Sequence, residues 1–294
     1  MKKLLRIRCE PSFWGRSILY TCILSLLIFL PCFSFAWFTK ADRGRCGGKS
    51  LSIEVSQTEG AFSHYYNPAY IPIPQQISFS NVIYFEDMYM GSLFYCKNRL
   101  AFELRYLDMG KFEETAIGFT GETVYLGTWT PFDLIFKTSY SFKGIGIAGK
   151  FIYEQIYYKP EGQGWALAFD VGVKKKIGKL DLTLVGRNLG TKIYYGSGNE
   201  EVLPLEFCQG IRYNLYDVLF LSGELREPID NDIYFCVNSE LNISLLSAMV
   251  GYNQNLDVLS LGCKVKLFDV DLSYSIQLLH PLSSTHRISL AVKL

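Results

Sequence analysis

Apolar and polar residues alternate with a period of two along most of the chain after residue 76. In residues 132–142, one parity carries Phe132, Leu134, Phe136, Tyr140 and Phe142, and polar residues stand between them, with Ile135 as the exception. Residues 165–174, 180–187 and 233–242 repeat the alternation. No stretch beyond the N-terminal region keeps a 3.6-residue apolar period, so the pattern predicts strands with one apolar and one polar face.

The same alternation gives the number of strands. Eleven strands are predicted between Phe132 and Leu294, and three more at Ile77–Phe85, Asp87–Lys97 and Arg99–Asp108, which makes fourteen. Residues 110–131 are predicted to form one large loop. An extra strand at Ile117–Leu126 would make the count odd, and the sequence leaves that question open.

The breaks between the predicted strands alternate in length. They are short at 143–144, 177–179 and 214–217, and longer at 159–164, 190–204 and 227–232; the tight break at Glu86 does not fit the scheme. Short turns at one end and long loops at the other are typical of outer-membrane barrels, whereas Greek-key sandwiches mix the two. We therefore predict an all-β fold, a closed antiparallel up-and-down transmembrane β-barrel of about 14 strands.

The last predicted strand, 286–294, is apolar on one face and charged on the other. A strand in that position needs no covering layer if it pairs with the first strand, because closure satisfies every backbone group within hydrocarbon. Ile288 and Leu290 would then face lipid, and Arg287 and Lys293 would face the lumen.

The first 36 residues have the composition of a secretory signal peptide. Basic residues precede an apolar run from Ile18 to Leu30, which is followed by Pro31 and by Ser34-Phe35-Ala36. We predict cleavage after Ala36; the alternative is a retained membrane anchor over residues 17–38. The predicted organisation is a signal peptide (1–36), an N-terminal tail or plug segment (37–76) and a transmembrane barrel (77–294), in the bacterial outer membrane.

Charge and cysteine content narrow the function. The chain has 29 basic and 28 acidic residues, so it lacks the overall basic field of a nucleic-acid-binding protein. Five cysteines remain after residue 36, at irregular spacing, and they predict neither a disulfide framework nor a zinc site. Cys208 and Cys236 are predicted to lie on the same face of the sheet, but one strand separates the two strands that carry them. That separation is too large for a disulfide bond.

Several short motifs occur in an order that points to a known family. Asn67-Pro68-Ala69 is followed by Asp170-Val-Gly-Val173 and Gly186-Arg-Asn-Leu-Gly190, and then by Leu203-Pro204, Gly210-Ile-Arg-Tyr213, Gly251-Tyr-Asn253 and Thr285–Leu290. Together they resemble the PorV/PorQ-like outer-membrane proteins, which are related to the FadL fatty-acid transporters and share their 14-stranded barrel. The resemblance implies a non-enzymatic accessory of protein secretion or surface attachment.

Motifs for catalysis or cofactor binding are weak in this sequence. Gly47-Gly-Lys-Ser50 lacks the earlier glycine of a phosphate loop and the strand that should lead into it. His64, His280 and His286 are scattered, and no Gly-x-Ser-x-Gly elbow occurs. We predict no catalytic residue, no cofactor and no metal site.

Charged residues at polar parity are expected to line the lumen. They form either a selectivity or ligand-binding lining or a paired network that fills the barrel, and their mixed sign favours the network. The twelve are Asp170, Asp181, Arg187, Glu206, Arg212, Glu224, Arg226, Glu240, Lys264, Lys266, Arg287 and Lys293.

Aromatic and apolar residues near loops are candidates for a plug or an entrance. Phe62, Tyr65, Tyr66, Asn67 and Pro68 form one group, which is left undecided. Around the 190–204 loop, Tyr194, Tyr195, Leu203 and Leu205 are the other group, and for residues adjoining strands we favour the interfacial aromatic belt.

Three functions therefore stay open, each with its own partners besides the lipid of the outer membrane. The first is a secretion or attachment accessory that binds cargo or secretion-machinery proteins through its long loops. The second is a FadL-like channel for hydrophobic small molecules with a plug over roughly residues 41–73, and the third is a structural surface protein.

Overall fold

The computed structural model describes residues 63–71, 75–84, 88–229, 232–278 and 284–294. The chain divides into two units, Met1–Ala41 and Asp42–Leu294, and all described residues belong to the second. The predicted signal peptide, Gly47–Ser50, Phe62 and His280 lie outside the described residues. Among those described, none of the helices has the length and apolar character to cross a membrane.

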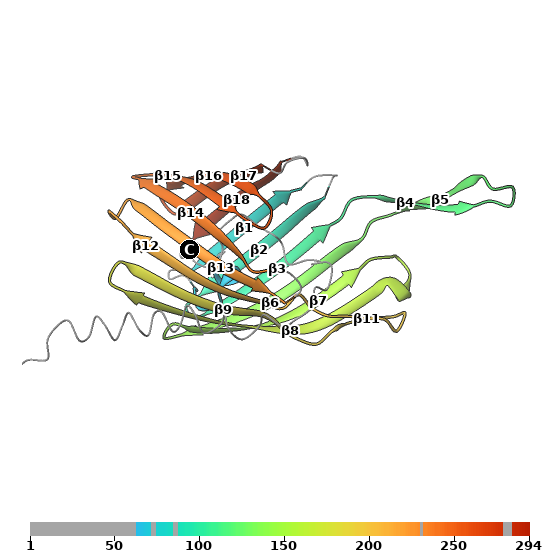
Figure 1. Ribbon diagram of the computed structural model, residues 1–294, viewed down its shortest axis with the longest axis horizontal. Helices are drawn as coiled ribbons and strands as arrows, with labels where there is room; N and C mark the ends of the chain where they lie inside the picture. The colour runs from blue at the N-terminus through green and yellow to red at the C-terminus, as the bar shows by residue number, and fades with distance from the viewer. Residues whose placement is uncertain (1–62, 72–74, 85–87, 230–231, 279–283) are drawn as a thin grey trace, which may run out of the picture. The chain divides into compact units, whose positions relative to one another are not determined.

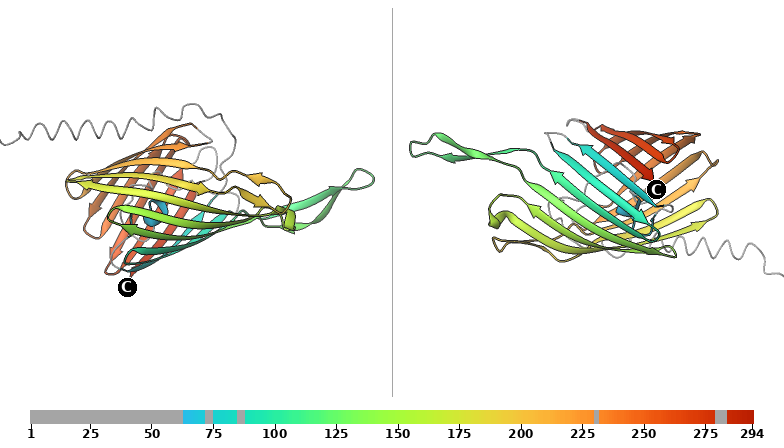
Figure 2. Two further views of the ribbon diagram at one scale, coloured as in Figure 1. Left: turned by 90° about the horizontal axis from the view of Figure 1, so that it is seen from below. Right: turned by 180° about the vertical axis from the view of Figure 1, so that it is seen from behind.

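Fourteen strands close into a ring of antiparallel neighbours (Figures 1 and 2). The first and last strands pair from Gln76 opposite Lys293 to Ile83 opposite His286, which confirms the predicted closed barrel. The ring consists of β1 (Gln76–Ile83), β2 (Tyr89–Lys97), β3 (Leu100–Asp108), β6 (Phe132–Phe142), β7 (Ile145–Gln155), β8 (Gln163–Ile177), β9 (Leu180–Gly190), β12 (Glu206–Asn214), β13 (Leu219–Pro228), β14 (Tyr234–Ile243), β15 (Leu246–Asn253), β16 (Val258–Leu267), β17 (Val270–Leu278) and β18 (Thr285–Lys293).

The predicted alternation decides which face of each strand points outward. On β8, Ala166, Ala168 and Asp170 are buried inside the barrel, while Leu167 and Phe169 are exposed on its outer surface. Side chains of successive residues point to opposite faces of a sheet, so an alternating sequence gives a polar lumen and an apolar exterior. Strand length varies around the ring, from 15 residues in β8 to 8 in β15.

The segment at 110–131 forms strands, but they do not join the ring. β4 (Phe112–Ile117) and β5 (Thr123–Trp129) pair with each other as a separate two-stranded sheet, which Figure 1 shows projecting from the long-loop end of the barrel. The question left open at Ile117–Leu126 is thereby answered, because the ring keeps its even count. Phe112 and Trp129 stack with ring centroids 5.5 Å apart at the base, and Phe119 at the tip is fully exposed.

The β9–β12 connection contains a second small hairpin, made of β10 (Ile193–Tyr195) and β11 (Glu200–Glu201). β10 pairs with β8, with Tyr194 opposite Trp165. The sequence analysis expected only a loop here. Strands of two or three residues are too short for the alternation to reveal them.

The opposite end of the barrel has tight turns, as predicted. Asn98, Lys143, Ser244 and Phe268 each begin a two-residue turn with φ between 48° and 57°. Two-residue hairpin turns with left-handed residues match the twist of the strands that they join. Two of these turns expose large apolar side chains, Leu245 and Phe268, and the longer β12–β13 turn exposes Tyr216.

Candidate functional site

Residues 63–71, which we call the inner segment, contact inward-facing side chains of the barrel wall. They comprise α2 (Ser63–Tyr66) and the Asn67-Pro68-Ala69 turn. The Asn67 side chain accepts a hydrogen bond from the Ala69 amide at 2.9 Å, and the Ser63 hydroxyl donates to the Tyr70 carbonyl at 2.8 Å. These local bonds hold the segment compact, with Tyr66, Asn67 and Ala69 almost completely buried.

Four basic side chains from four strands converge on Tyr65 and Tyr66. Their target oxygens are the two backbone carbonyls and the two phenol hydroxyls, and hydrogen bonds from charged donors are about twice as strong as neutral ones. Arg187 donates two bonds to the Tyr66 carbonyl (2.7 and 3.2 Å), Lys137 one to the Tyr65 carbonyl (2.9 Å), Arg105 one to the Tyr65 hydroxyl (3.0 Å) and Arg287 one to the Tyr66 hydroxyl (2.7 Å).

Two glycines of the wall make room for the inner segment. A Cβ atom at Gly146 would overlap the backbone of Pro68 and Ala69, and one at Gly172 would overlap the Asn67 side chain. Nearby, the Ser141 hydroxyl donates to the Ala69 carbonyl at 3.0 Å. The close approach of backbone to wall therefore requires residues without side chains at these positions.

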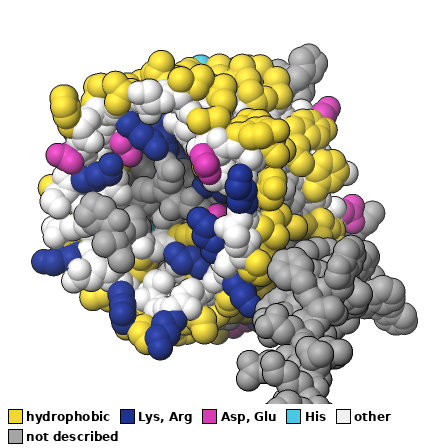
Figure 3. Space-filling model, turned by 90° about the vertical axis from the view of Figure 1, so that its left-hand side faces the viewer, with side chains coloured by type: hydrophobic (Ala, Val, Ile, Leu, Met, Phe, Trp, Pro, Cys, Tyr) yellow, Lys and Arg dark blue, Asp and Glu magenta, His cyan; other side chains and the backbone are white. Residues whose placement is uncertain are grey.

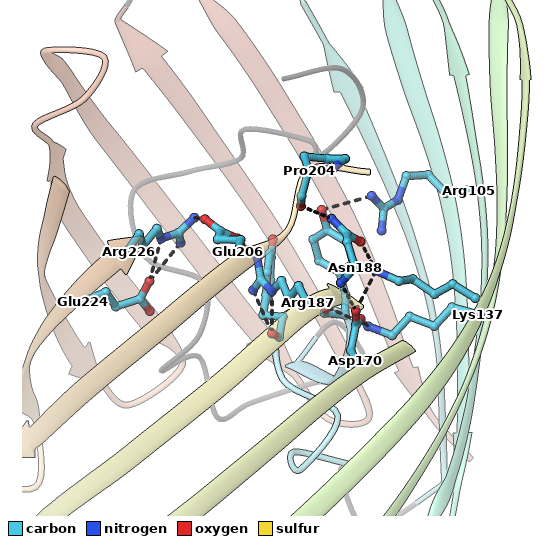
Figure 4. Close-up of polar contacts among 12 residues, drawn as sticks. Arg105, Lys137, Asp170, Arg187, Asn188, Pro204, Glu206, Glu224 and Arg226 are labelled. Atoms are coloured by element: carbon cyan, nitrogen blue, oxygen red, sulfur yellow. Dashed lines mark hydrogen bonds and ion pairs between the residues drawn. The ribbon is translucent and has the colours of Figure 1, made fainter. Parts of the chain in front are cut away.

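Asp170 on β8 is the centre of the first buried ion cluster (Figure 4). One of its oxygens lies 2.8 Å from Lys137 Nζ, and the other lies 2.7 Å from Lys150 Nζ and accepts the Asn188 amide at 3.0 Å. Asn188 has a φ of 59°, next to the place where the β8–β9 register shifts. The irregularity directs the Asn188 amide toward the Asp170 carboxylate. The Asp170-Val-Gly and Asn188-Leu-Gly motifs therefore have a structural role, because they form this contact between β8 and β9.

A second cluster lies on β9, β12 and β13, next to the first in Figure 4. The Glu206 carboxylate is 3.1 Å from Arg187 and 3.9 Å from Arg226, and Arg226 is 2.9 Å from Glu224. Arg187 thus joins the cluster to the inner segment. A further buried pair, Arg212 with Glu240 at 2.9 Å, lies on β12 and β14.

All twelve residues predicted to line the lumen lie on inward faces of their strands. Seven of them form ion pairs: Asp170, Arg187, Glu206, Arg212, Glu224, Arg226 and Glu240. The other five, Asp181, Lys264, Lys266, Arg287 and Lys293, lie at further inward positions, and Arg287 contacts both Ser80 and Tyr66. Of the plug candidates, Tyr65, Tyr66, Asn67 and Pro68 belong to the inner segment.

Several residues that complete these clusters are not among the twelve predicted from the sequence. Glu103, Arg105, Lys137, Lys150 and Glu154 are all inward and almost buried. Each stands next to at least one outward-facing apolar or aromatic residue, such as Phe102 and Leu104 around Glu103. The parity that identified the other twelve would have identified these five as well.

The long-loop end of the lumen contains an apolar cluster. Ile135 and Ile152 of the wall pack there with Ile193 and Leu203 of the β9–β12 connection. Tyr195 packs against them, and its hydroxyl lies within hydrogen-bond distance of the Glu154 and Glu201 carboxylates. Burial and the hydrogen bond to Glu154 raise the pKa of Tyr195 far above its usual value.

This cluster corrects our preference for an aromatic belt around the 190–204 loop. The preference is wrong for Tyr195 and Leu203, because the connection folds inward and carries both into the lumen. Tyr194, the alternate residue on β10, faces the other way and contacts the exposed Trp165 ring at 6.1 Å. One strand pair therefore sends neighbouring tyrosines to opposite faces.

An apolar hollow of about 490 Å³ lies on the outer surface. It lies on β18, β1, β2 and β3, where Gly91 leaves a gap in the outward-facing side chains. Phe79, Leu93 and Leu104 line it. The ladder beneath it is continuous and in register, so the hollow is a depression in the wall and not an opening.

Groups suited to metal or thiol chemistry are dispersed. In the described ranges, no three His, Cys, Asp or Glu side chains gather closely enough to hold a metal ion. Cys208 and Cys236 are buried free thiols, in agreement with the strand that was predicted between them. His286 lies on β18 with its ring nitrogen 2.8 Å from the Tyr274 hydroxyl.

Comparison with known proteins gives matches only among solved structures. Neither a family model nor a curated protein matches the chain. The Pseudomonas putida toluene transporter TodX aligns with a TM-score of 0.54 and 10% identity over 81% of this chain and 94% of TodX. The CymD monoaromatic hydrocarbon channel aligns with a TM-score of 0.50 and 11% identity, over 82% and 95%. At this identity the likeness shows a shared barrel fold.

Proposed function

We propose that this chain is a bacterial outer-membrane channel for hydrophobic small molecules, gated by the inner segment. The observation that carries the proposal is how that segment is attached. In the described part of the chain, residues 63–71 pair with no strand of the ring, and side chains of the wall hold them in place. The segment can therefore leave the lumen without breaking any of the barrel's ladder pairs.

The contents of the lumen support a route for an apolar molecule once the segment moves. The apolar cluster of Ile135, Ile152 and Leu203 lies on the long-loop side of Lys137 and Asp170. Ligand sites of this kind are mostly apolar with a few fixed polar groups. Most of the lumenal charges named above are paired with a charge of opposite sign, so the lumen would carry no strong net positive or negative charge.

The shared fold is consistent with this proposal. TodX and CymD are described as a toluene transporter and a monoaromatic hydrocarbon channel, and both are barrels of similar extent. Their substrates suggest the chemical class to test first. Non-enzymatic transport also agrees with the sequence, which has no nucleophile motif beside a general base.

The proposal is tested by flux through proteoliposomes that contain purified, heat-modifiable protein. A labelled long-chain fatty acid and toluene are the two probes. Arg187→Gln removes two bonds to the Tyr66 carbonyl, so we expect it to raise the flux of at least one probe several-fold. Lys192→Gln is the matched control, because Lys192 is an exposed loop residue paired only with Glu200. Absence of flux in both variants, with intact barrels, would refute the channel.

The β4–β5 hairpin supports a second function, the secretion or attachment accessory that the PorV/PorQ resemblance implies. The hairpin exposes Ile117, Phe119 and Leu126 together with two glutamates, Glu113 and Glu122. An isolated two-stranded sheet is only marginally stable in water, and its open edges can accept another strand. Cargo or secretion-machinery proteins would bind there. Deletion of residues 112–129 should abolish such binding and leave small-molecule flux unchanged.

A further inference from the structure

Six exposed basic side chains lie on or directly beside three short turns that are neighbours around the ring. The turns are β2–β3, β6–β7 and β8–β9, and the strand order β8-β7-β6-β3-β2 makes them consecutive. Figure 3 shows Lys and Arg side chains gathered at this end of the barrel, bordered by hydrophobic ones. We call this set the basic arc: Lys97, Arg99, Lys143, Lys175, Lys176 and Lys179.

The basic arc has no acidic partner within the described residues. None of its six members forms an ion pair with a carboxylate there, in contrast to the lysines and arginines that are paired inside the lumen. Three acidic residues lie near the short turns: Asp181 is opposite Lys176 on β9, Asp217 is on the neighbouring β12–β13 turn, where Lys179 donates to the Leu215 carbonyl at 3.4 Å, and Asp269 is on the more distant β16–β17 turn. The six basic residues outnumber the two acidic residues beside them. The arc is therefore a local excess of positive charge.

Two members of the arc approach the same outward-facing ring. The Arg99 guanidinium lies 4.8 Å from the centroid of Phe142, and Lys143 Nζ lies 5.2 Å from it. An exposed aromatic ring attracts cations, but two like charges at one ring also repel each other unless an anion lies between them. Phe142 therefore brings two positive charges of the arc together at one outward-facing ring.

The arc lies where the apolar exterior of the wall ends. Leu100, Phe142 and Ile145 are exposed on the outer surface directly beside its turns, as is Ile177 at the end of β8. In a membrane this boundary falls at the level of the lipid headgroups, where long basic side chains extend toward phosphate. An acidic protein would need to approach past the same headgroups, so lipid is the occupant that the position favours.

We propose that the basic arc binds the phosphate groups of anionic phospholipids in the leaflet that faces the short turns. The inference rests on the proposed placement of the barrel in a membrane. Clustered Lys and Arg residues at a membrane surface attract anionic lipid additively, and the attraction weakens with salt. The other short turns, which carry Tyr216, Leu245 and Phe268, should show no such preference.

Quenching of a single tryptophan by brominated lipids tests the proposal. The four native tryptophans are replaced by Phe in the full-length chain, and Phe142→Trp places the reporter inside the arc. Phe268→Trp is the matched reporter in an apolar turn of the same barrel end. Both proteins are reconstituted in phosphatidylcholine bilayers with brominated phosphatidylglycerol or brominated phosphatidylcholine.

We expect the reporter at 142 to prefer phosphatidylglycerol over phosphatidylcholine by about threefold or more, as a cluster of basic residues implies. The reporter at 268 should show equal quenching by both lipids. Adding Arg99→Gln, Lys143→Gln and Lys175→Gln should remove the preference at 142. Salt at about 0.5 M should weaken it, because the Debye length falls to roughly 4 Å.

Equal quenching by both lipids at position 142 would overturn the inference and leave the membrane barrel standing. A preference that survives the triple neutralisation would overturn it as well, because Arg99 and Lys143, the two cations at the reporter ring, would not be its source. Failure of the proposed membrane placement looks different. In that case neither brominated lipid quenches either reporter, and the unheated protein shows no compact band on a gel.

Discussion

At the scale of single residues, Asp170 of β8 links its own strand to β6, β7 and β9. Its carboxylate contacts Lys137 and Lys150, and Lys137 in turn holds the Tyr65 carbonyl of the inner segment. Removing one partner of a buried ion pair leaves the remaining charge without compensation, which costs more than the pair contributed. The stability of the wall and the position of the inner segment therefore depend on the same side chain.

Asp170→Asn should accordingly destabilise the barrel strongly. The substitution keeps the shape but leaves two buried ammonium groups beside a neutral amide, and we expect a loss of about 3–5 kcal/mol in the free energy of unfolding. Urea unfolding in micelles, followed by loss of the compact gel band, measures it. Lys192→Gln, which breaks only the exposed pair with Glu200, should leave the midpoint of urea unfolding unchanged. A wild-type midpoint for Asp170→Asn would contradict the stabilising role of the buried cluster.

Gly146 offers a way to move the inner segment without touching a charge. A methyl group at this position would overlap the Pro68 and Ala69 backbone, so Gly146→Ala should displace the segment while the ring stays closed. We expect faster chymotrypsin cleavage after Tyr65 and Tyr66, detected by mass spectrometry. A Cβ atom at Gly149 on the same strand has no atom within 4 Å, so the Gly149→Ala variant should be cleaved at the same rate as the wild type.

At the scale of elements, the sequence predicted the ring strands well and the small hairpins poorly. Alternation over eight or more residues is a strong signal, and it placed all eleven strands from Phe132 onward. β10, with three residues, has no measurable period. The clusters inside the lumen were predictable by face but not by distance, because parity places Lys137 and Asp170 inward without saying that they meet across β7.

The β4–β5 hairpin is an element that the barrel should not need. It forms its own sheet, and its described links to the wall are at its base, such as Trp129 against Tyr157 at 5.2 Å. Replacing residues 112–129 by a short Gly-Ser linker should change the free energy of unfolding by less than about 1 kcal/mol. Loss of the compact band in that variant would show that the hairpin is part of the folding unit.

At the scale of the whole molecule, closure is the property on which the fold depends. β18 supplies partners to both β17 and β1, so its absence would expose two strand edges to hydrocarbon, where unpaired backbone groups cost several kcal/mol each. A chain that stops after Leu278 should therefore fail to form the heat-modifiable compact band. The hairpin deletion described above is its control, since it removes more residues without opening the ring.

The short-turn end of the barrel differs from one side to the other. On one side the strands end in the basic arc, and β8 is longer than the 9–11 residues that a bilayer requires. On the opposite side β15 has only 8 residues, and its neighbouring turns expose Leu245 and Phe268. With its axis perpendicular to the membrane, such a wall cannot match the hydrophobic thickness of a flat bilayer on both sides. The axis should lean toward the side of Phe268, or the lipid there should thin, so that hydrophobic mismatch fixes the orientation of the barrel axis.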